Sequence, residues 1–404
     1  MKLLYFGTIC NLEAYDRRFE GLASKPSVAP IVFESALLNG FHQNGADIEI
    51  HSFPMIPAFP TYRAVHFGGI TEQLPCGYSC RWLNTINLPV LKQFSRRLDA
   101  RKALRRWLKA HREDGLILTY SIPPFLVKDV LSYAKKYGVK TAAIIPDLLR
   151  DMYINEPQDT FSYRLKQAYL APALKLQDQY DGYIYLTEAM QEVVAPGKSH
   201  MIMEGIADTD HILPPVPEEK AVPRAIMYAG MLHEKYGILN LVDAFEKLDD
   251  KDAQLWLFGD GTAVPEIKKR AAANPNIRYG GTVSRESILT YERQATLLIN
   301  PRDPDEEFTK FSFPSKTIEY MLSGTPLITT RLQGIPEEYF DFVFPADGSS
   351  TDALAAAMQN ALGRSEQDLH EMGIRAQQFI QQEKNAARQA QRILTFLEGL
   401  HYES

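Results

Sequence analysis

The sequence predicts an α/β protein with two domains, each a doubly wound parallel sheet. Its 404 residues are too many for one ordinary domain and suit two. Short apolar runs alternate with helical patterns in both halves, which is typical of repeated strand–helix–strand units. A Pro-rich stretch at 206–224, near the middle of the chain, interrupts this alternation and predicts a linker.

The first half, 1–205, begins with an apolar run at 2–6 that ends at Gly7, and this run predicts the first strand. Apolar residues spaced near 3.6 predict a helix over 29–44. Helical stretches separate the further strands that we expect at 46–53, 115–120, 141–145 and 182–187. Repeated units of this kind predict a parallel sheet with helices on both faces.

The second half, 225–385, repeats this pattern after the linker. It begins with a predicted strand at 225–230 and a predicted helix over 238–248, and a polar stretch with helical apolar spacing follows it at 366–400. Further strands are expected at 254–259, 276–281, 295–300 and 325–330. Two such Rossmann-like domains face each other across a cleft between the carboxyl ends of their strands, where open α/β sheets bind ligands.

Charge and cysteine content restrict the class of protein. Lys plus Arg is 44 and Asp plus Glu is 50, so the net charge of 44 − 50 = −6 argues against a dedicated nucleic-acid-binding protein. Three cysteines are too few for a disulfide framework and suit a reducing compartment. Neither an export signal nor an apolar run of about 18 residues is apparent. We therefore expect a cytoplasmic protein, at most peripheral to a membrane.

Two loops of the second half have the composition of ligand-binding turns. Lys235 lies between a strand that ends at Gly230 and a helix that follows Gly237, which favours either a phosphate site or a plain turn with a solvated lysine. Gly259 and Asp260 follow the next strand. There, glycine allows the close approach of a ligand or of backbone, although Asp-Gly is also an ordinary turn.

The most informative stretch surrounds Lys316. Pro314 is expected to open a helix with Ser315, Lys316 and Thr317 in its first turn, so that free N–H groups, two hydroxyls and an ammonium converge where a diphosphate binds. Glu319, about one turn later, is placed to accept hydrogen bonds from the vicinal hydroxyls of a ribose. The alternative is a well-capped helix with an acid near its N-terminus.

The phrases YAGMLHEKYGI, LFGDG, NPR and FPSKTIEYMLSGTP occur in this order and resemble the donor half of retaining, GT-B-fold glycosyltransferases of the family 4-like type, in a bacterial capsular or exopolysaccharide-type branch. The resemblance is close in the second half of the chain and looser in the first. It implies a hexosyltransferase that uses a nucleotide-diphosphate sugar and a glycan acceptor, lipid-linked in surface polysaccharide synthesis. It also implies retention, no metal and no cofactor, and a C-terminal helix, 386–404, that returns to the N-terminal domain.

The resemblance also implies roles for individual residues. Glu319 corresponds to the glutamate that holds the donor ribose, and Lys235 to the lysine that neutralises the diphosphate. The residues expected to act in catalysis are Lys235, Arg302 and Asp147. The residues expected to bind the donor are Gly7, Thr8, Gly259, Asp260, Val283, Ser315, Lys316, Thr317 and Glu319.

Three positions depart from the family pattern. Phe311 stands where many relatives have an upstream glutamate, and Met231 stands where many have an arginine. Asp147 lacks the histidine that often precedes it. Two alternatives therefore stay open, a non-catalytic nucleotide-sugar-binding or scaffold protein and a sugar epimerase of the same fold.

A basic segment at 92–112 holds nine Lys and Arg residues and one acid, Asp99. It favours contact with an anionic membrane surface or, equally, a solvated helix with Trp107 packed inward. The apolar loop 53–62 is expected to be a packed loop or the lining of an acceptor groove. Asp303 and Asp305 resemble a metal-binding Asp-x-Asp motif, but a solvated loop is the favoured interpretation.

Overall fold

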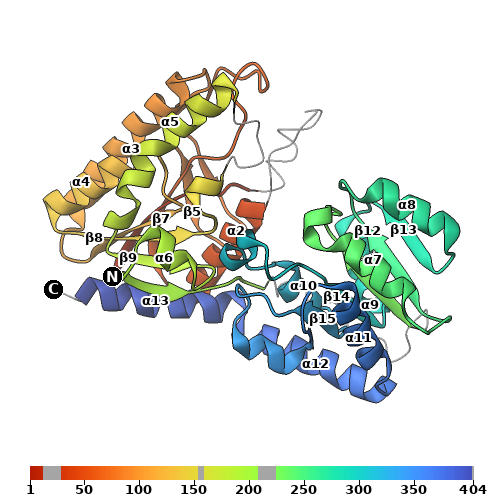
Figure 1. Ribbon diagram of the computed structural model, residues 1–404. Coiled ribbons are helices and arrows are strands. Elements are labelled where there is room, and N and C mark those ends of the chain that lie inside the picture. Colours follow the sequence, from red (N-terminus) through yellow and green to blue (C-terminus); the bar gives the residue numbers. More distant parts are fainter. Residues whose placement is uncertain (12–28, 153–158, 208–223, 403–404) are drawn as a thin grey trace. The chain divides into compact units, whose positions relative to one another are not determined.

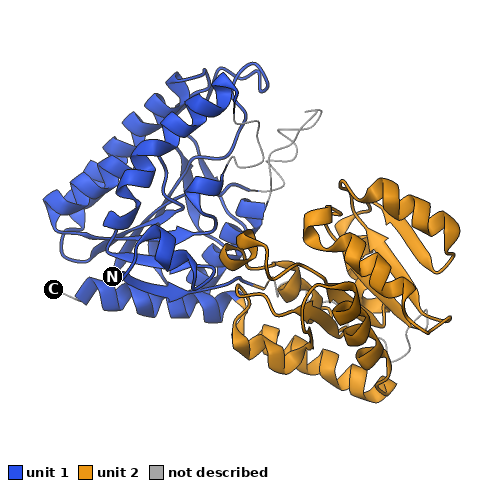
Figure 2. Ribbon diagram, viewed as in Figure 1, with its two compact units in different colours: residues 1–206, 386–404 blue, residues 207–385 orange. Residues whose placement is uncertain are grey.

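The computed structural model describes residues 1–11, 29–152, 159–207 and 224–402. These residues form two compact units, 1–206 with 386–404 and 207–385, and each is described by itself (Figure 2). Most of the predicted linker, 206–224, lies outside the described residues. Within the described ranges, no helix is both long and apolar enough to cross a membrane.

The first unit is built on an eight-stranded sheet with the order β10-β9-β8-β7-β1-β2-β5-β4. All neighbours are parallel except β4, which pairs antiparallel with β5. The strands are β1 (Lys2–Gly7), β2 (Asp47–Ser52), β4 (Thr71–Gln73), β5 (Ser79–Trp82), β7 (Gly115–Tyr120), β8 (Lys140–Ile145), β9 (Gly182–Tyr185) and β10 (Ser199–Ile202).

Helices cover both faces of this sheet (Figure 1). One face packs against α2 (Ala29–Gln43) and α13 (Ala386–Tyr402), whose apolar residues join those of the strands in one core. The remaining elements are the helices α3 (Leu91–Ala110), α4 (Val127–Tyr137), α5 (Phe161–Leu176) and α6 (Met190–Val194), the short 3-10 helices η1 (Leu149–Asp151) and η2 (Gln177–Gln179), and the two-stranded pair β3 (His66–Phe67) and β6 (Thr85–Ile86).

The packing of α2 against α13 requires a glycine at position 40. A Cβ atom at Gly40 would lie 2.1 Å from the backbone oxygen of Ala386 and 2.7 Å from Cβ of Ala390. Nearby, Asn44 Nδ2 donates to the Ala387 oxygen at 2.9 Å. These contacts hold a helix from the end of the chain against a helix from its beginning.

Replacing Gly40 with alanine is therefore expected to lower the free energy of unfolding by about 1–3 kcal/mol, the usual cost of overpacking. Helix propensity alone predicts the opposite sign, a gain of about 1 kcal/mol. The matched control is Gly399→Ala in α13, where an added Cβ meets nothing within 4 Å. Urea unfolding of both variants measures the difference, and equal midpoints would contradict the packing argument.

The second unit has a six-stranded, wholly parallel sheet with the order β13-β12-β11-β14-β15-β16. Its strands are β11 (Ala225–Ala229), β12 (Gln254–Phe258), β13 (Ile277–Gly281), β14 (Leu297–Asn300), β15 (Leu327–Thr330) and β16 (Phe344–Ala346). Its helices are α7 (Ile238–Glu246), α8 (Val264–Ala273), α9 (Arg285–Gln294), α10 (Lys316–Leu322), α11 (Thr351–Leu362) and α12 (Glu366–Glu383), with the 3-10 helices η3 (Glu234–Tyr236), η4 (Glu307–Phe311) and η5 (Glu337–Phe342).

The predicted fold class, α/β with two doubly wound parallel-sheet domains, is confirmed. Two details differ. The first sheet carries an antiparallel edge strand, and the helical stretch 366–400 divides into α12 and α13. The division lies at Lys384, whose backbone leaves the helical region at φ −116° and ψ 10° and whose oxygen accepts a hydrogen bond from the Ala207 N–H at 2.8 Å.

Each sheet has one point where the strand order reverses, and ligands of open α/β sheets bind beside such points. In the second unit this point lies between β11 and β14, and in the first unit it lies between β1 and β7. The loops that leave the carboxyl ends of these strands are therefore the places to examine for function.

Candidate functional site

Two cations lie at the reversal point of the second sheet, both close to the same aromatic ring. Lys235 is in η3, after β11, and Arg302 is two residues beyond β14. The guanidinium carbon of Arg302 is 5.0 Å from the centre of the Tyr236 ring, and the Lys235 ammonium is 5.4 Å from it. The structure thus brings together two of the three residues that were predicted to act in catalysis.

Arg302 has no acidic partner in the described part of the chain. Its Nη1 atom is buried and meets no hydrogen-bond acceptor. The groups that interact with it electrostatically are the phenols of Tyr228, Tyr236 and Tyr320, and desolvation lowers the pKa of its guanidinium. Because a buried cation without an anion is costly, this arrangement is typical of a site whose anion comes from a ligand.

A second cluster lies where α10 packs near α9. Lys316 Nζ donates to Oε1 of Glu319 and lies 3.9 Å from Oε1 of Glu292. Glu292 is fully buried, and neither of its carboxylate oxygens meets a donor in the described residues. The two carboxyl groups face each other beside one ammonium.

Two facing carboxylates cannot hydrogen bond unless one of them keeps a proton. Burial and the neighbouring Glu319 raise the pKa of Glu292 to about 9, so Glu292 is the protonated member at neutral pH. Although burial opposes ionisation of Glu319 as well, Lys316 and the hydrogen bonds lower its pKa overall. Glu319 is therefore the ionised member, held between a carboxylic acid and an ammonium.

Glu292 is a residue that sequence reasoning missed. It lies in the mostly polar helix α9, between Tyr291 and Arg293. In such a helix most acidic residues are exposed, and nothing in the spacing distinguishes this one. Only tertiary contacts bury it: its carboxyl lies beside Lys316 and Glu319 of α10, and its backbone oxygen accepts a hydrogen bond from Thr325 Oγ1 at 2.8 Å.

Tyr320 connects the two clusters. Its hydroxyl donates to the Ala229 oxygen at 3.0 Å and accepts from the Ala229 N–H at 2.8 Å, which fixes α10 against the end of β11. The Lys316 ammonium lies 5.8 Å from the centre of its ring, and its phenol interacts electrostatically with Arg302. Lys235, Arg302, Lys316 and Glu319 therefore belong to one region of the second unit.

The other predicted residues near α10 and α9 are placed differently. Ser315 is exposed and precedes α10 without a capping side-chain bond, whereas the Thr317 hydroxyl is buried and has no partner in the described residues. Val283 is half-buried, next to Ser284, whose hydroxyl caps α9. Because α10 has only seven residues, the positive charge here comes from side chains more than from the helix dipole.

Gly259 and Asp260 have local structural functions. The backbone of Gly259 has φ 130°, and a Cβ atom there would lie 1.8 Å from the Gly230 oxygen. Only glycine allows the loops after β11 and β12 to approach this closely. The Asp260 carboxylate accepts from the Gly261 N–H at 2.8 Å, as in an ordinary turn. The Asp303 carboxylate likewise accepts from the Asp305 N–H at 2.9 Å.

Comparison with known proteins shows what this region is similar to. Residues 223–364 match the family described as Glycosyl transferases group 1, and this segment contains both clusters. This segment of the chain is therefore similar to the group 1 glycosyl transferases. No protein of curated function matches the chain in sequence.

Solved structures resemble the whole chain. Sucrose-phosphate synthase from Thermosynechococcus elongatus is 15% identical, with 100% of both chains covered and a TM-score of 0.61. The lipopolysaccharide outer core galactosyltransferase WaaB in its apo form is 14% identical, with 99% of both chains covered and a TM-score of 0.60. Anabaena HepE in complex with UDP is 13% identical, covering 99% of this chain and 100% of that chain, with a TM-score of 0.58. At these identities the likeness shows the fold, and the expected GT-B fold is confirmed.

Three predicted residues lie outside the matched segment 223–364, in the first unit. Gly7 ends β1 and Thr8 follows it. Thr8 is buried; its N–H lies 2.9 Å from Glu34 Oε1, and its hydroxyl also donates to that oxygen. Asp147 follows β8; its side chain is exposed, yet the surrounding protein desolvates its carboxyl and raises its pKa.

Glu34 was not predicted, and it supports the loop after β1. It is fully buried and accepts hydrogen bonds from Thr8 and from the Tyr5 hydroxyl at 2.7 Å. Burial raises the pKa of Glu34 to about 7, although the hydrogen bonds from Thr8 and Tyr5 act in the opposite direction. Its charge therefore changes near neutral pH.

This carboxyl is expected to make the stability of the first unit fall as the pH rises from 4.5 to 7. In that window the folded state binds the Glu34 proton and the unfolded state does not, so the loss is about 3 kcal/mol in all. Glu34→Gln should flatten this dependence, and Glu398→Gln, an exposed change in α13, should not. Urea unfolding at a series of pH values measures it, and the same slope in all three proteins would contradict the assignment.

Most of the basic segment 92–112 lies in α3, which ends at Ala110, and neighbouring elements pair with part of its charge. Arg97 Nε lies 2.5 Å from the Asp129 carboxylate, and Arg106 lies 2.5 Å from Glu49. Trp107 is 4% exposed and packs inward, as expected for the alternative of a solvated helix.

Proposed function

We propose that this protein is a glycosyltransferase that moves a sugar from a nucleotide-diphosphate sugar to a glycan acceptor, with retention and without a metal. The acceptor is lipid-linked and the pathway is bacterial surface polysaccharide synthesis, at the cytoplasmic face of the membrane. The proposal rests mainly on the half-buried Arg302. Its Nη1 atom is buried without an acceptor, it has no anionic partner in the described residues, and it lies near Lys235 in the segment that matches the group 1 glycosyl transferases.

The charged side chains of the second unit suit the diphosphate and the ribose of such a donor. Arg302, Lys235 and Lys316 supply positive charge for a diphosphate, and Glu319 is an ionised acceptor for ribose hydroxyls. The structural relative HepE was solved with UDP and, in a further structure, with UDP and glucose. A uridine diphosphate sugar is therefore the first donor to test.

In the proposed reaction, the bond between the sugar anomeric carbon and the diphosphate oxygen breaks. The acceptor hydroxyl oxygen bonds to the same face of that carbon, which retains its configuration. The hydroxyl proton passes to an oxygen of the leaving diphosphate. Arg302, Lys235 and Lys316 act by stabilising the negative charge that develops on the diphosphate.

Membrane contact is proposed for the beginning of α3. Val90, Leu91, Phe94 and Leu98 are 80%, 45%, 58% and 43% exposed, beside the basic residues of the same helix. Apolar side chains next to cations are typical of a surface that binds anionic lipid headgroups. Such contact would hold the enzyme where a lipid-linked acceptor lies.

Phe94→Ser is expected to weaken binding to vesicles rich in phosphatidylglycerol by about tenfold, since burying a phenylalanine contributes about 1.5–3 kcal/mol. Tyr402→Ser is the control, because Tyr402 is 76% exposed on α13. Co-sedimentation measures both variants, and equal binding would exclude this part of α3 from the membrane surface.

The donor site is tested by thermal unfolding with UDP, GDP, ADP, CMP and dTDP, with and without EDTA. A ligand at about 100 times its dissociation constant stabilises the folded protein by about 2.7 kcal/mol. One diphosphate is expected to raise the melting temperature equally in both conditions. Loss of the shift with EDTA would contradict metal independence, and no shift with any nucleotide would contradict the donor site.

Catalysis needs a second measurement, since a pure binding protein would give the same shift. Mass spectrometry of the matching nucleotide sugar, incubated with the protein, is expected to show slow release of the nucleotide diphosphate. Binding without any release would favour the non-catalytic alternative.

A further inference from the structure

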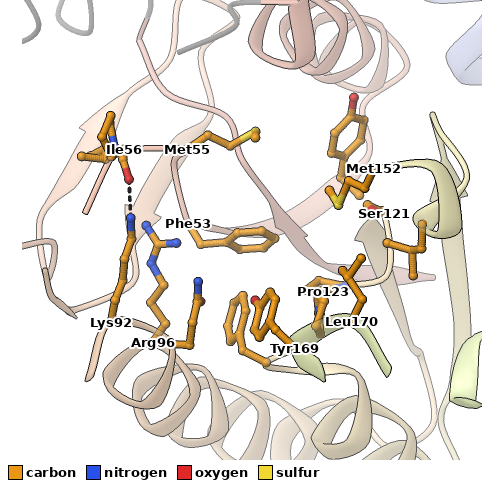
Figure 3. Close-up of a pocket in the computed structure, with 16 residues that line it drawn as sticks. Phe53, Met55, Ile56, Lys92, Arg96, Ser121, Pro123, Met152, Tyr169 and Leu170 are labelled. Carbon is orange, nitrogen blue, oxygen red and sulfur yellow. Dashed lines mark hydrogen bonds between the residues drawn. The ribbon is translucent and has the colours of Figure 1, made fainter. Parts of the chain in front are cut away.

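The first unit contains a pocket of about 420 Å³ at the carboxyl end of its sheet (Figure 3). It is lined by the loop after β2, the loop after β7, η1, and the beginning of α3 and part of α5. The lining includes Phe53 and Phe125, whose rings meet edge to face at 5.1 Å between centroids. The pocket thus lies beside the strand-order reversal of the first sheet.

Two cations of α3 form one side of this pocket. Lys92 and Arg96 are one helical turn apart, and their head groups lie side by side in Figure 3. Lys92 donates to the Ile56 oxygen, and Arg96 Nη2 donates to the Pro54 oxygen at 2.8 Å. None of the lining residues is acidic. Carbonyl groups therefore satisfy some of the N–H groups, but nothing among the lining residues neutralises the two positive charges.

Their surroundings make these charges costly. Arg96 is 4% exposed, and desolvation lowers the pKa of its guanidinium to about 10. Desolvation, and then repulsion by Arg96, lower the pKa of Lys92 to about 8. By contrast, Arg97 of the same helix pairs with Asp129. Unlike Arg97, Lys92 and Arg96 have no carboxylate partner in the described residues although both are desolvated, and an anion bound in the pocket would neutralise them.

The rest of the lining is mostly apolar. Tyr169 and Leu170 of α5 also line the pocket, and Met55 and Met152 are 48% and 47% exposed there. Ser121, also in the lining, has a left-handed backbone at φ 61°, a strain that is typical of functional loops. A ligand that fits must combine an anionic group with an apolar part.

We propose that this pocket binds an organic phosphate, with its phosphate oxygens on Lys92 and Arg96 and its organic part against Phe53, Phe125 and Tyr169. If this organic phosphate is the sugar acceptor, that assignment rests on the proposed glycosyltransferase function. The proposal that the pocket binds a phosphate does not rest on it. Phosphate suits two adjacent cations because its two negative charges and several acceptor oxygens match both of them.

Isothermal titration of the full chain with dodecyl phosphate and with glucose 6-phosphate tests the proposal. At least one is expected to bind, and Lys92→Gln is expected to weaken that binding about tenfold or more, since a charge-assisted hydrogen bond is lost. Lys92→Arg should retain the binding. Lys102→Gln is the matched control, because Lys102 is an exposed lysine of the same helix outside the pocket.

The two ligands distinguish the source of the phosphate. Tighter binding of dodecyl phosphate indicates a lipid phosphate, and tighter binding of glucose 6-phosphate indicates a soluble sugar phosphate.

The proposal is overturned if neither compound binds, if Lys92→Gln binds as well as the native protein, or if dodecyl glucoside, which lacks the phosphate, binds as tightly as dodecyl phosphate. Nucleotide binding distinguishes this failure from failure of the donor site. Lys92→Gln should leave the nucleotide-induced rise in melting temperature unchanged, and that rise also confirms that the variant is folded. A protein that binds nucleotide but no organic phosphate would overturn this inference alone.

Discussion

Replacing Arg302 with methionine is expected to weaken nucleoside diphosphate binding by about 30-fold or more. A hydrogen bond to a charged group contributes about 2 kcal/mol, and a guanidinium can form two with one diphosphate. Methionine keeps the length and most of the volume of the side chain, so the packing against the Tyr236 ring is largely preserved. Isothermal titration with the diphosphate that shifts the melting temperature measures the loss.

Although Arg302→Met is expected to lose affinity, the stability of the ligand-free variant is not expected to fall. An arginine that held the fold together would destabilise the protein when removed. Arg302 has a buried Nη1 without an acceptor, and it forms no ion pair among the residues described. Removing such a charge relieves a desolvation cost, so the free energy of unfolding should be equal or higher.

Lys251→Met is the matched control for charge. Lys251 is exposed in the loop before β12, at the amino end of that strand and so at the edge of the sheet away from the site. This variant should bind the diphosphate as the native protein does. Loss of stability without loss of affinity in Arg302→Met would show that Arg302 has a structural function instead.

The fold was largely predictable from the sequence because its strands are short, continuous apolar runs. The run at 2–6 became β1, and the run at 115–120 became β7, since a strand buried on both faces tolerates few polar residues. The strands that were missed, such as β3 and β6, have two residues each, which is too short for any periodic pattern.

The residues of the candidate site that lie in sequence motifs could be predicted, whereas those that only tertiary packing brings to the site could not. The sequence singled out Lys235, Arg302, Lys316 and Glu319 because they lie in loops or helix starts that follow strands, as the resemblance implied, and their roles stay predictions. Glu292 and Glu34 are acidic residues in helices, and only tertiary contacts bury them. Likewise, the sequence shows nine cations in 92–112 but not that two of them face a pocket without acids.

The second large expected effect is on donor binding, and it follows from substitutions of Glu292 and depends on pH. Glu292→Gln is expected to bind the donor nearly as the native protein does at pH 7, because glutamine is isosteric with the protonated acid and can donate to Glu319. Glu292→Ala removes that donor and leaves a cavity beside Glu319. We expect it to weaken donor binding about tenfold, since Glu319 then loses one of the two groups that hold it.

The native protein and Glu292→Gln should differ above pH 9. There Glu292, with its pKa near 9, ionises beside Glu319, and a second negative charge repels the donor diphosphate. Donor affinity of the native protein should therefore fall through this range, whereas that of Glu292→Gln should stay level. Titrations at pH 7 and pH 10 measure the difference, and parallel losses in both proteins would contradict a shared proton.

The pH dependence of stability is an independent test of the protonation of Glu292. Between pH 4.5 and pH 9 the folded state keeps a proton on Glu292 that the unfolded state has released, so Glu292 destabilises the native protein progressively as the pH rises. Glu292→Gln lacks this cost and should be the more stable protein at pH 8. Because Lys316 and Glu319 are unchanged in that variant, a gain in stability with unchanged donor affinity would assign Glu292 a positioning role, in which it orients Glu319 and does not touch the donor itself.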